Sequence, residues 1–343
     1  MNQKILVTGG AGFIGAHSSD YFANKGWDVF IVDSLVRRGA EENLKWLESR
    51  HTVGFRKCDI RDKDAVAGCI RDFQPNVVLH LAAQVAVTTS VSDPRHDFET
   101  NALGSFNMLE AVRKHSFDSF FINASTNKVY GKMEEVGVCE RNKRYEYENQ
   151  PLGISETFPL DFHSPYGCSK GTADQYTIDY SRIYGLQTTT FRQSCIYGTR
   201  QFGIEDQGWV AWFSIAAALG KNITIFGDGK QIRDVLHVSD LVRAYDAAIA
   251  HRDSSSGHAF NIGGGPQNTL SLLELLSFLK ESLGESIQFK YDQWRPGDQK
   301  VFVCDISKAN SILDWRPTIS VQDGVRELIE WVKANPDLFK WLA

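Results

Sequence analysis

The sequence predicts an α/β fold in which a parallel β-sheet is covered by helices on both faces. In the first half of the chain, short apolar runs alternate with stretches of helical spacing. Repetition of strand, helix and strand produces parallel sheets with right-handed crossovers. The apolar runs also lack alternating polar residues, which indicates strands that are buried on both faces.

The expected elements follow one another regularly at first and less regularly later. In the first half the strands are Ile5–Thr8, Asp28–Val32, Val53–Lys57, Val77–Leu81 and Ser119–Asn123, and the helices are Ile14–Asn24, Lys63–Phe73 and Pro94–Lys114. In the second half the polar segment Lys132–Phe162 is expected to be a long loop, and Thr188–Phe191 a strand. The remaining helices are expected at Ser164–Tyr184, Trp209–Leu219, Ser239–Ala250, Leu270–Leu283 and Val321–Lys333.

This change in regularity predicts two domains. We expect residues 1–190 together with about 231–257 to form the sheet domain. Residues 191–230 together with about 258–343 would form a smaller α/β domain that binds a substrate. A chain of 343 residues with 42% hydrophobic content is long enough to bury a large core in either arrangement.

Charge and cysteine content narrow the classes of function. The net charge is −5 and there is no run of five or more Lys and Arg residues, so we expect no nucleic-acid partner. The six cysteines form no Cys-x-x-Cys pair and do not cluster with histidines, which favours reduced cytoplasmic thiols and no metal site. No signal peptide and no apolar run of 18 residues is present, so we expect a cytoplasmic protein without a membrane span.

A glycine-rich turn joins the first expected strand to the first expected helix. Its sequence, Thr8-Gly9-Gly10-Ala11-Gly12-Phe13-Ile14-Gly15, is typical of Rossmann dinucleotide sites, in which the backbone approaches a pyrophosphate at a helix N-terminus. The fold class is therefore a Rossmann-type doubly wound parallel sheet with a smaller α/β substrate-binding domain. Asp33 ends the next strand and would accept the ribose hydroxyls of NAD. Arg37 and Arg38 follow in the loop and could instead meet the 2′-phosphate of NADP, but the carboxylate favours NAD.

Tyr166 and Lys170 are four residues apart in an expected helix, so their side chains share one face. An ammonium about 4 Å from a phenolate stabilises it by about 4 kcal/mol at an effective dielectric constant of about 20. We therefore expect Lys170 to lower the pKa of Tyr166 and to make it a base that takes a hydroxyl proton while a hydride leaves the same carbon.

Together these motifs resemble the NAD-dependent sugar epimerase/dehydratase family of extended short-chain dehydrogenases/reductases, over nearly the whole chain. The matching elements are TGGAGFIG at 8–15, Asp33, Asp59-Ile60, His80-Leu81-Ala82-Ala83, Asn101, Ser125-Thr126, Val129-Tyr130-Gly131, Tyr166 with Lys170, and Arg233-Asp234. The resemblance implies a catalytic set of Thr126, Tyr166 and Lys170. It implies cofactor contacts from Gly9, Gly12, Phe13, Ile14, Gly15, Asp33, Asp59, Ile60, Leu81, Ala82, Ala83, Asn101, Ser125, Tyr166 and Lys170.

Two departures from the family pattern are informative. Sugar dehydratases of this family carry an Asp-Glu pair directly after the catalytic Thr, because loss of water needs an acid and a base there. This chain has Asn127-Lys128, which disfavours dehydration. Family members also usually carry an Asn where this chain has Cys195, so one expected contact to the diphosphate or sugar is in doubt.

Several longer segments resemble the CDP-paratose 2-epimerases, a branch of this family. They include Ser125–Gly131, Leu160–Lys170, Gln207–Val210 and Gly229–His237. The resemblance implies C2 inversion of CDP-paratose to CDP-tyvelose in the making of O-antigen sugars. A C4 epimerase of a UDP- or CDP-hexose and a non-catalytic NAD-binding sensor are the alternatives.

The substrate would be a nucleotide-diphosphate sugar, most simply a CDP-sugar. Its expected contacts are Thr126, Ser194, Gln201, Gln207, Trp209, Arg233, Arg295 and Asp298. Arg233 and Arg295 would grip the diphosphate, although either could instead form a surface ion pair, and Trp209 could belong to the core. The resemblance also implies a homo-oligomer, a dimer or tetramer, that pairs through the helices at 94–114 and 164–184.

Overall fold

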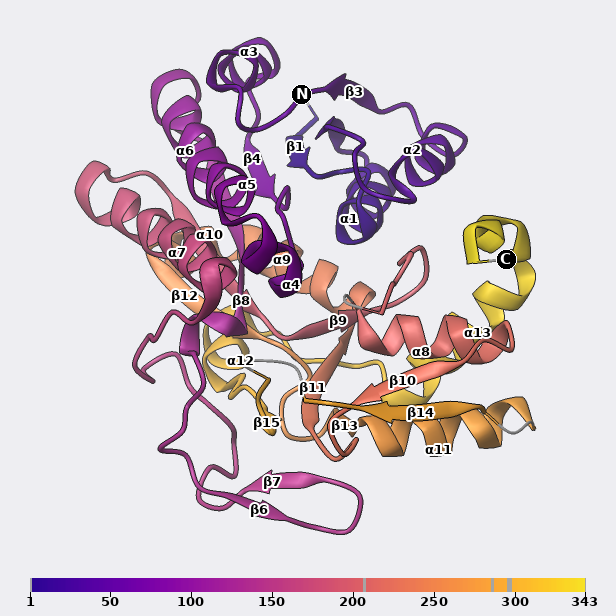
Figure 1. The fold of residues 1–343 in the computed structure, drawn as a ribbon. Coiled ribbons are helices and arrows are strands. Elements are labelled where there is room, and N and C mark those ends of the chain that lie inside the picture. The colour runs from indigo at the N-terminus through magenta and orange to yellow at the C-terminus, as the bar shows by residue number, and fades with distance from the viewer. Residues whose placement is uncertain (1, 206–207, 285–286, 295–297, 343) are drawn as a thin grey trace.

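The computed structural model describes residues 2–342 except 206–207, 285–286 and 295–297. Its centre is a parallel sheet of seven strands in the order β12-β8-β5-β4-β1-β2-β3 (Figure 1). In that order the strands are His258–Ile262, Thr188–Gln193, Phe120–Thr126, Val77–His80, Lys4–Thr8, Asp28–Asp33 and Gly54–Lys57. Reversal of the order at β1 and β4 is the arrangement of a doubly wound Rossmann sheet, as the sequence predicts.

Helices cover both faces of this sheet because its strands are apolar on both sides. In β1, Ile5 and Val7 face one core while Leu6 faces the other. The first core is closed by α1 (Phe13–Asn24), α2 (Ala40–Glu48), α9 (Val238–Ala250) and α12 (Ser307–Leu313). The second core is closed by α3 (Lys63–Phe73), α6 (Gly104–His115) and α7 (Ser164–Tyr184).

A second, smaller lobe lies beside the carboxyl ends of the strands (Figure 1). It contains a small sheet of β13 (Thr269–Ser271), β11 (Ile232–His237), β15 (Val301–Phe302) and β9 (Cys195–Tyr197). A parallel pair joins β10 (Ile223–Phe226) to the exposed strand β14 (Phe289–Asp292). The lobe has an apolar core of its own, formed by β10, α8 (Trp209–Ala218), α11 (Leu272–Leu283), α13 (Val321–Ala334) and the C-terminal 3-10 helix η3 (Pro336–Leu342).

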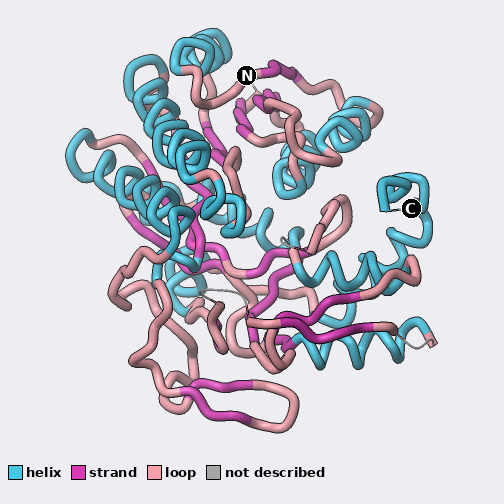
Figure 2. Tube along the Cα trace, in the orientation of Figure 1, coloured by secondary structure: helices cyan, strands magenta, loops and turns pink. Residues whose placement is uncertain are grey.

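Most expected elements are present, but the strands β9 to β15, which include the whole small sheet, were not expected. The helix expected at 94–114 is broken into α5 (Pro94–Phe98), a π-helical turn η1 (Glu99–Leu103) and α6. The segment 132–162, expected to be loop, contains a projecting hairpin of β6 (Val138–Glu140) and β7 (Tyr145–Tyr147), visible in Figure 2. The short elements α2, α4 (Val87–Ser92), α10 (Arg252–Ser255) and the 3-10 turn η2 (Asn127–Tyr130) were not expected.

The chain passes repeatedly between the two lobes. It leaves the large sheet after β8, returns for α9 and β12, leaves again for β13 and α11, and returns once more for α12. Two strands therefore lie across the expected domain boundaries, since β12 belongs to the large sheet and β11 to the small one. The division into a cofactor domain and a substrate domain stays a prediction, with its boundaries moved at these strands.

Among the helices that the structure describes, none is both long enough and apolar enough to cross a membrane.

Candidate active site

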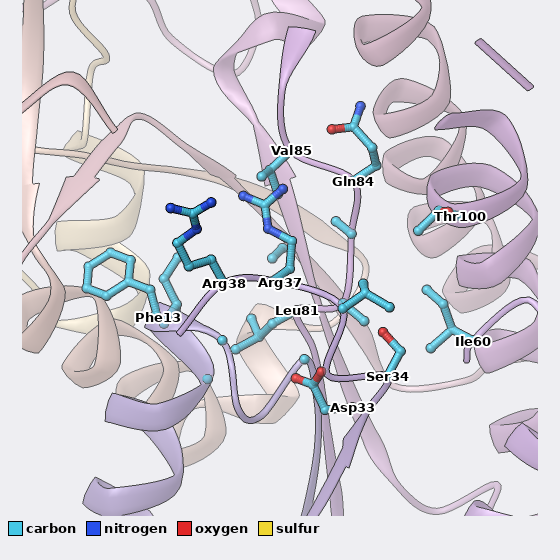
Figure 3. A pocket seen from close by; sticks show the side chains of 18 of the residues that line it. Phe13, Asp33, Ser34, Arg37, Arg38, Ile60, Leu81, Gln84, Val85 and Thr100 are labelled. Atoms are coloured by element: carbon cyan, nitrogen blue, oxygen red, sulfur yellow. The ribbon is translucent and has the colours of Figure 1, made fainter. Parts of the chain in front are cut away.

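A cavity of about 500 Å³ lies where the loops after β1, β2 and β4 meet the end of β5 (Figure 3). Ligands of doubly wound sheets bind at this edge, outside the carboxyl ends of the strands. The cavity is lined by nearly all the expected cofactor contacts, namely Gly9, Gly12, Phe13, Ile14, Gly15, Asp33, Asp59, Ile60, Leu81, Ala82, Ala83, Ser125, Tyr166 and Lys170. The motif spacing in the sequence therefore brings these residues to one place.

The glycine turn is built for close backbone approach. Gly9 has a φ of +66°, and a Cβ atom there would lie 2.8 Å from the backbone N of Ala82. A Cβ on Gly15 would lie 2.1 Å from the carbonyl oxygen of Gly9. Gly12 is the N-cap of α1 and no side chain caps that helix, so its first N–H groups keep their capacity to bind a pyrophosphate.

Asp33 occupies the position of a ribose acceptor. Its Oδ2 accepts a hydrogen bond from the Ala11 N–H at 3.0 Å, and its Oδ1 accepts one from the Leu35 N–H at 2.8 Å. The N–H groups of Gly12 and Ser34 also lie close enough to lower its pKa, although burial raises that pKa overall, and the carboxylate would repel a 2′-phosphate. Arg37 and Arg38 also line the cavity (Figure 3), and the Arg38 guanidinium lies 3.9 Å from the ring centroid of Trp341.

Asn101 is the one expected cofactor residue that does not line the cavity. It lies in the π-helical turn η1, where its Oδ1 accepts from the Gln84 N–H at 2.8 Å and its Nδ2 donates to the Gln84 carbonyl at 2.9 Å. Gln84 and Val85 do line the cavity. Asn101 thus fixes the loop after β4 and supports the cavity through that loop.

Tyr166 and Lys170 share one face of α7, as expected, but their electrostatic relation differs from the expectation. The Lys170 ammonium donates to the Ala124 carbonyl at 2.5 Å. Burial raises the pKa of Tyr166 to about 12, against a lowering effect of its hydrogen bond with Thr126. Burial also lowers the pKa of Lys170 to about 8. Lys170 is not among the groups that shift the pKa of Tyr166 in this structure, so the expected lowering by its charge is not seen.

Thr126 and Ser125 end β5 beside this pair. The Thr126 side chain lies near enough to Tyr166 to lower the pKa of that phenol. Its hydroxyl donates to the Asn127 side-chain oxygen at 3.3 Å and accepts from the Lys128 N–H at 3.3 Å, which caps η2. The Ser125 hydroxyl donates to the buried Asp174 at 2.7 Å, so its side chain is held by α7. The three expected catalytic residues, Thr126, Tyr166 and Lys170, are thus close together.

The expected substrate residues are placed less uniformly. Gln201 lines the cavity, whereas Ser194 donates its hydroxyl to Asp234. Trp209 begins α8 and packs against the apolar core of the smaller lobe, so the core interpretation fits it. Arg233 donates to the Asp298 carboxylate at 2.7 Å and to the Ile232 carbonyl at 2.7 Å. Gln207 and Arg295 lie outside the described residues.

Lys128 is a site residue that sequence reasoning noted only as a departure from the dehydratases. It follows Thr126 on η2, and its Nζ atom lies 3.5 Å from the Gln299 side-chain oxygen. Burial, and then the charge of Arg233, lower the pKa of Lys128 to about 8. Cys195 is close enough to Arg233 and Lys128 for both charges to lower its pKa, although burial raises it overall. The signal that sequence reasoning missed is the positive charge of Lys128, at a position where the sugar dehydratases of the family carry an acidic residue.

A second missed feature is the loop that follows β9. Arg200, Phe202 and Gly203 from this loop line the cavity opposite the glycine turn. The Arg200 guanidinium lies 4.0 Å from the ring centroid of Trp46, and a Cβ on Gly39 would collide with the Phe202 ring. Of the lining residues from this loop, only Gln201 was expected to contact a ligand, because the role of the others depends on tertiary packing.

The sequence profile described as GDP-mannose 4,6 dehydratase matches residues 6–328. The chain belongs to this family. The CDP-paratose 2-epimerase of Salmonella typhi is 45% identical to it over 337 residues, which cover 97% of this chain and 100% of the relative. The predicted membership in the epimerase/dehydratase group is thereby confirmed.

Solved structures of family members agree in fold. UDP-glucose 4-epimerase of Thermotoga maritima, solved with UDP-glucose, has a TM-score of 0.84 at 32% identity, covering 97% of this chain and 100% of that one. UDP-glucose 4-epimerase of Thermus thermophilus, solved with NAD, has a TM-score of 0.79 at 32% identity, covering 96% and 98%. The family is NAD-dependent and the glycine turn and Asp33 fit NAD, so the predicted cofactor is confirmed.

Proposed function

We propose that this protein is an NAD-dependent epimerase that inverts C2 of a CDP-linked deoxysugar, converting CDP-paratose to CDP-tyvelose. The observation that carries the proposal is the 45% identity to a CDP-paratose 2-epimerase along the full length of both chains. The geometry agrees, since Tyr166 and Lys170 line the same cavity and Thr126 follows the lining residue Ser125 at the end of β5.

The proposed roles of these residues follow from their contacts. The Thr126 hydroxyl would bond to the reacting sugar oxygen and orient it toward Tyr166. Tyr166 would accept the proton of that hydroxyl during oxidation and return it during reduction. Lys170 supplies a positive charge on the same helix face, held in place by the Ala124 carbonyl. When bound, NAD supplies the hydride acceptor and donor, and its positively charged ring favours the tyrosinate.

The substrate chemistry favours direct oxidation at C2. Paratose has no 3-hydroxyl, so C3 cannot be oxidised to make the C2 proton acidic. A ketone at C4 would acidify only C3 and C5. Removal of the C2 hydrogen as hydride and of the hydroxyl proton by Tyr166 leaves a 2-keto sugar. Return of the same hydride and proton on the other face balances the reaction without solvent.

Isotope incorporation tests this proposal. The reaction is run in deuterated water and monitored by NMR. CDP-paratose should give CDP-tyvelose without deuterium at C2. Stoichiometric deuterium at C2 would show proton abstraction instead. CDP-glucose and UDP-glucose in parallel reactions define the accepted sugar and base. Absence of C2 inversion with CDP-paratose would overturn the proposal.

A C4 epimerase is the second candidate, favoured by the structural match to the UDP-glucose 4-epimerases. The same product analysis decides between the two, because inversion at C4 converts UDP-glucose to UDP-galactose. A non-catalytic NAD sensor is disfavoured, because Tyr166 and Lys170 both line the cavity beside the end of β5 at Thr126, and a sensor does not need such a proton-transfer set.

We also propose that the protein is a cytoplasmic homo-oligomer. Apolar side chains are exposed along α5 to α7, among them Phe98 (57% exposed), Phe106 (38%) and Tyr176 (46%). The Phe106 and Tyr176 rings meet edge to face across α6 and α7, with centroids 5.8 Å apart. Contiguous exposed apolar surface of this kind is typical of an interface. All six cysteines are free thiols, which suits a reducing compartment.

A further inference from the structure

The site of reaction on the sugar depends on where the diphosphate is held. The β-phosphate is attached to C1 of the sugar through one oxygen, and C2 is the neighbouring ring carbon. C4 lies across the ring. An enzyme that presents C2 to its base must therefore hold the β-phosphate closer to that base than an enzyme that presents C4.

Lys128 is placed close to the proposed base. Its backbone N–H donates to the Thr126 hydroxyl at 3.3 Å, and the Thr126 side chain lies near enough to Tyr166 to lower its pKa. Its Nζ atom reaches to Gln299, whose own amide nitrogen donates to the Gly131 carbonyl. Gln299 is 4% exposed, so the ammonium is oriented by a fixed and buried partner.

The charges around Lys128 are not balanced. Arg233 is 8% exposed and its guanidinium is already bound by the Asp298 carboxylate at 2.7 Å. Over the part of the chain that the structure describes, Lys128 forms no ion pair within 4.0 Å. Lys128, Arg233 and Asp298 together leave one positive charge in a partly desolvated site, which an incoming anion would neutralise.

We propose that Lys128 is a specificity-determining residue that binds the β-phosphate of the nucleotide sugar and thereby places C2, not C4, beside Tyr166. This inference rests on the C2 epimerase function proposed above. Arg233, in turn, holds the Asp298 carboxylate next to Gln299. An anchored β-phosphate also lets the 2-keto sugar turn over while the nucleotide stays in place.

Nucleotide binding separates this role from a merely structural one. Calorimetry would compare CDP with CMP, which lacks the β-phosphate, on wild type, Lys128→Met, Lys128→Gln and Lys128→Arg. Lys132→Met is the matched control, because Lys132 lies on the same segment but is 45% exposed and pairs with Glu134. We expect Lys128→Met and Lys128→Gln to weaken CDP binding by about 10- to 100-fold, the range for a charge-assisted contact, and to leave CMP binding unchanged. Lys128→Arg should restore most of the affinity.

Product analysis adds the second readout. We expect the residual activity of Lys128→Gln to show a smaller ratio of C2 to C4 inversion than wild type. Equal losses for CDP and CMP, or wild-type CDP affinity in both neutral variants, would overturn the proposal. NAD content and circular dichroism identify a misfolded Lys128→Met, in which case Lys128→Gln and Lys128→Arg decide. If wild type fails to invert C2 at all, the proposed function fails, whereas the CDP and CMP titrations still judge phosphate binding by Lys128.

Discussion

Replacement of Tyr166 by Phe removes one hydroxyl and keeps the ring. The side chain is 9% exposed on α7, and Thr126 lies near enough to lower the pKa of its hydroxyl. Thr126 would keep its contacts with the Lys128 N–H and the Asn127 side chain, both at 3.3 Å. At most one neutral hydrogen bond is lost, so the free energy of unfolding should fall by no more than about 1 kcal/mol, and the variant should fold and retain NAD.

The effect on catalysis should be far larger than the effect on folding. With a pKa of about 12, Tyr166 holds its proton firmly in the free protein, so only a substrate and cofactor in place make it an effective base. Loss of a positioned acid–base group costs about 10²- to 10⁴-fold in kcat. The KM should change little, because the hydroxyl is not a diphosphate contact.

The assay measures kcat and KM for CDP-paratose by NMR, with bound NAD quantified after denaturation. Tyr176→Phe is the matched control, since Tyr176 lies on the same helix but is 46% exposed on the outer face. The control should keep wild-type kcat. Retention of more than about a tenth of wild-type kcat by Tyr166→Phe would show that another group takes the proton.

Three further predictions concern the cofactor, the assembly and pH. Asp33→Asn keeps hydrogen-bonding capacity but removes the charge, so the preference for NAD over NADP in the co-purified nucleotide should fall about tenfold; an unchanged preference contradicts the assigned role. Phe106→Asp should convert a wild-type dimer or tetramer to monomer in light scattering at micromolar concentration, and a monomeric wild type refutes the interface. The Lys128 pKa of about 8 lies below its ordinary value, and the protonated form binds phosphate. The KM should thus be constant below pH 8 and rise above it, by up to about tenfold per pH unit. Burial also lowers the pKa of Lys170 to about 8, so the two lysines must be told apart. An arginine at position 128 stays protonated, so Lys128→Arg should abolish the rise in KM, and a rise that persists contradicts the assignment to Lys128.

The parts of the fold that the sequence predicts are those that local patterns determine. Strands such as Val77–His80 are apolar on both sides, and α3 and α7 begin and end at the expected residues. The π-helical turn at 99–103 could not be predicted, because it depends on Asn101 reaching across to Gln84. The position of β12 at the sheet edge could not be predicted either, because it depends on pairing with β8, and no local sequence pattern determines which strands pair.

The candidate site divides in the same way. Spacing brought the glycine turn, Asp33, Tyr166 and Lys170 to one cavity, because each follows or faces a strand end whose position the fold dictates. The partners of the charged side chains could not be predicted from the spacing of residues in the sequence. The Lys170 ammonium bonds to a backbone carbonyl and Arg233 to Asp298, and both partners come from segments distant in sequence.

The interleaved path of the chain has a consequence for protein engineering. Because β9, β11, α11 and α13 belong to the smaller lobe while β8, α9, β12 and α12 belong to the larger one, no single junction separates the two. A chimera that joins this chain to a relative at a single point, in order to change its sugar selectivity, would build the core of each lobe from segments of two different proteins. Transplanting specificity into this scaffold requires several simultaneous junctions, or point substitutions confined to the facing loops.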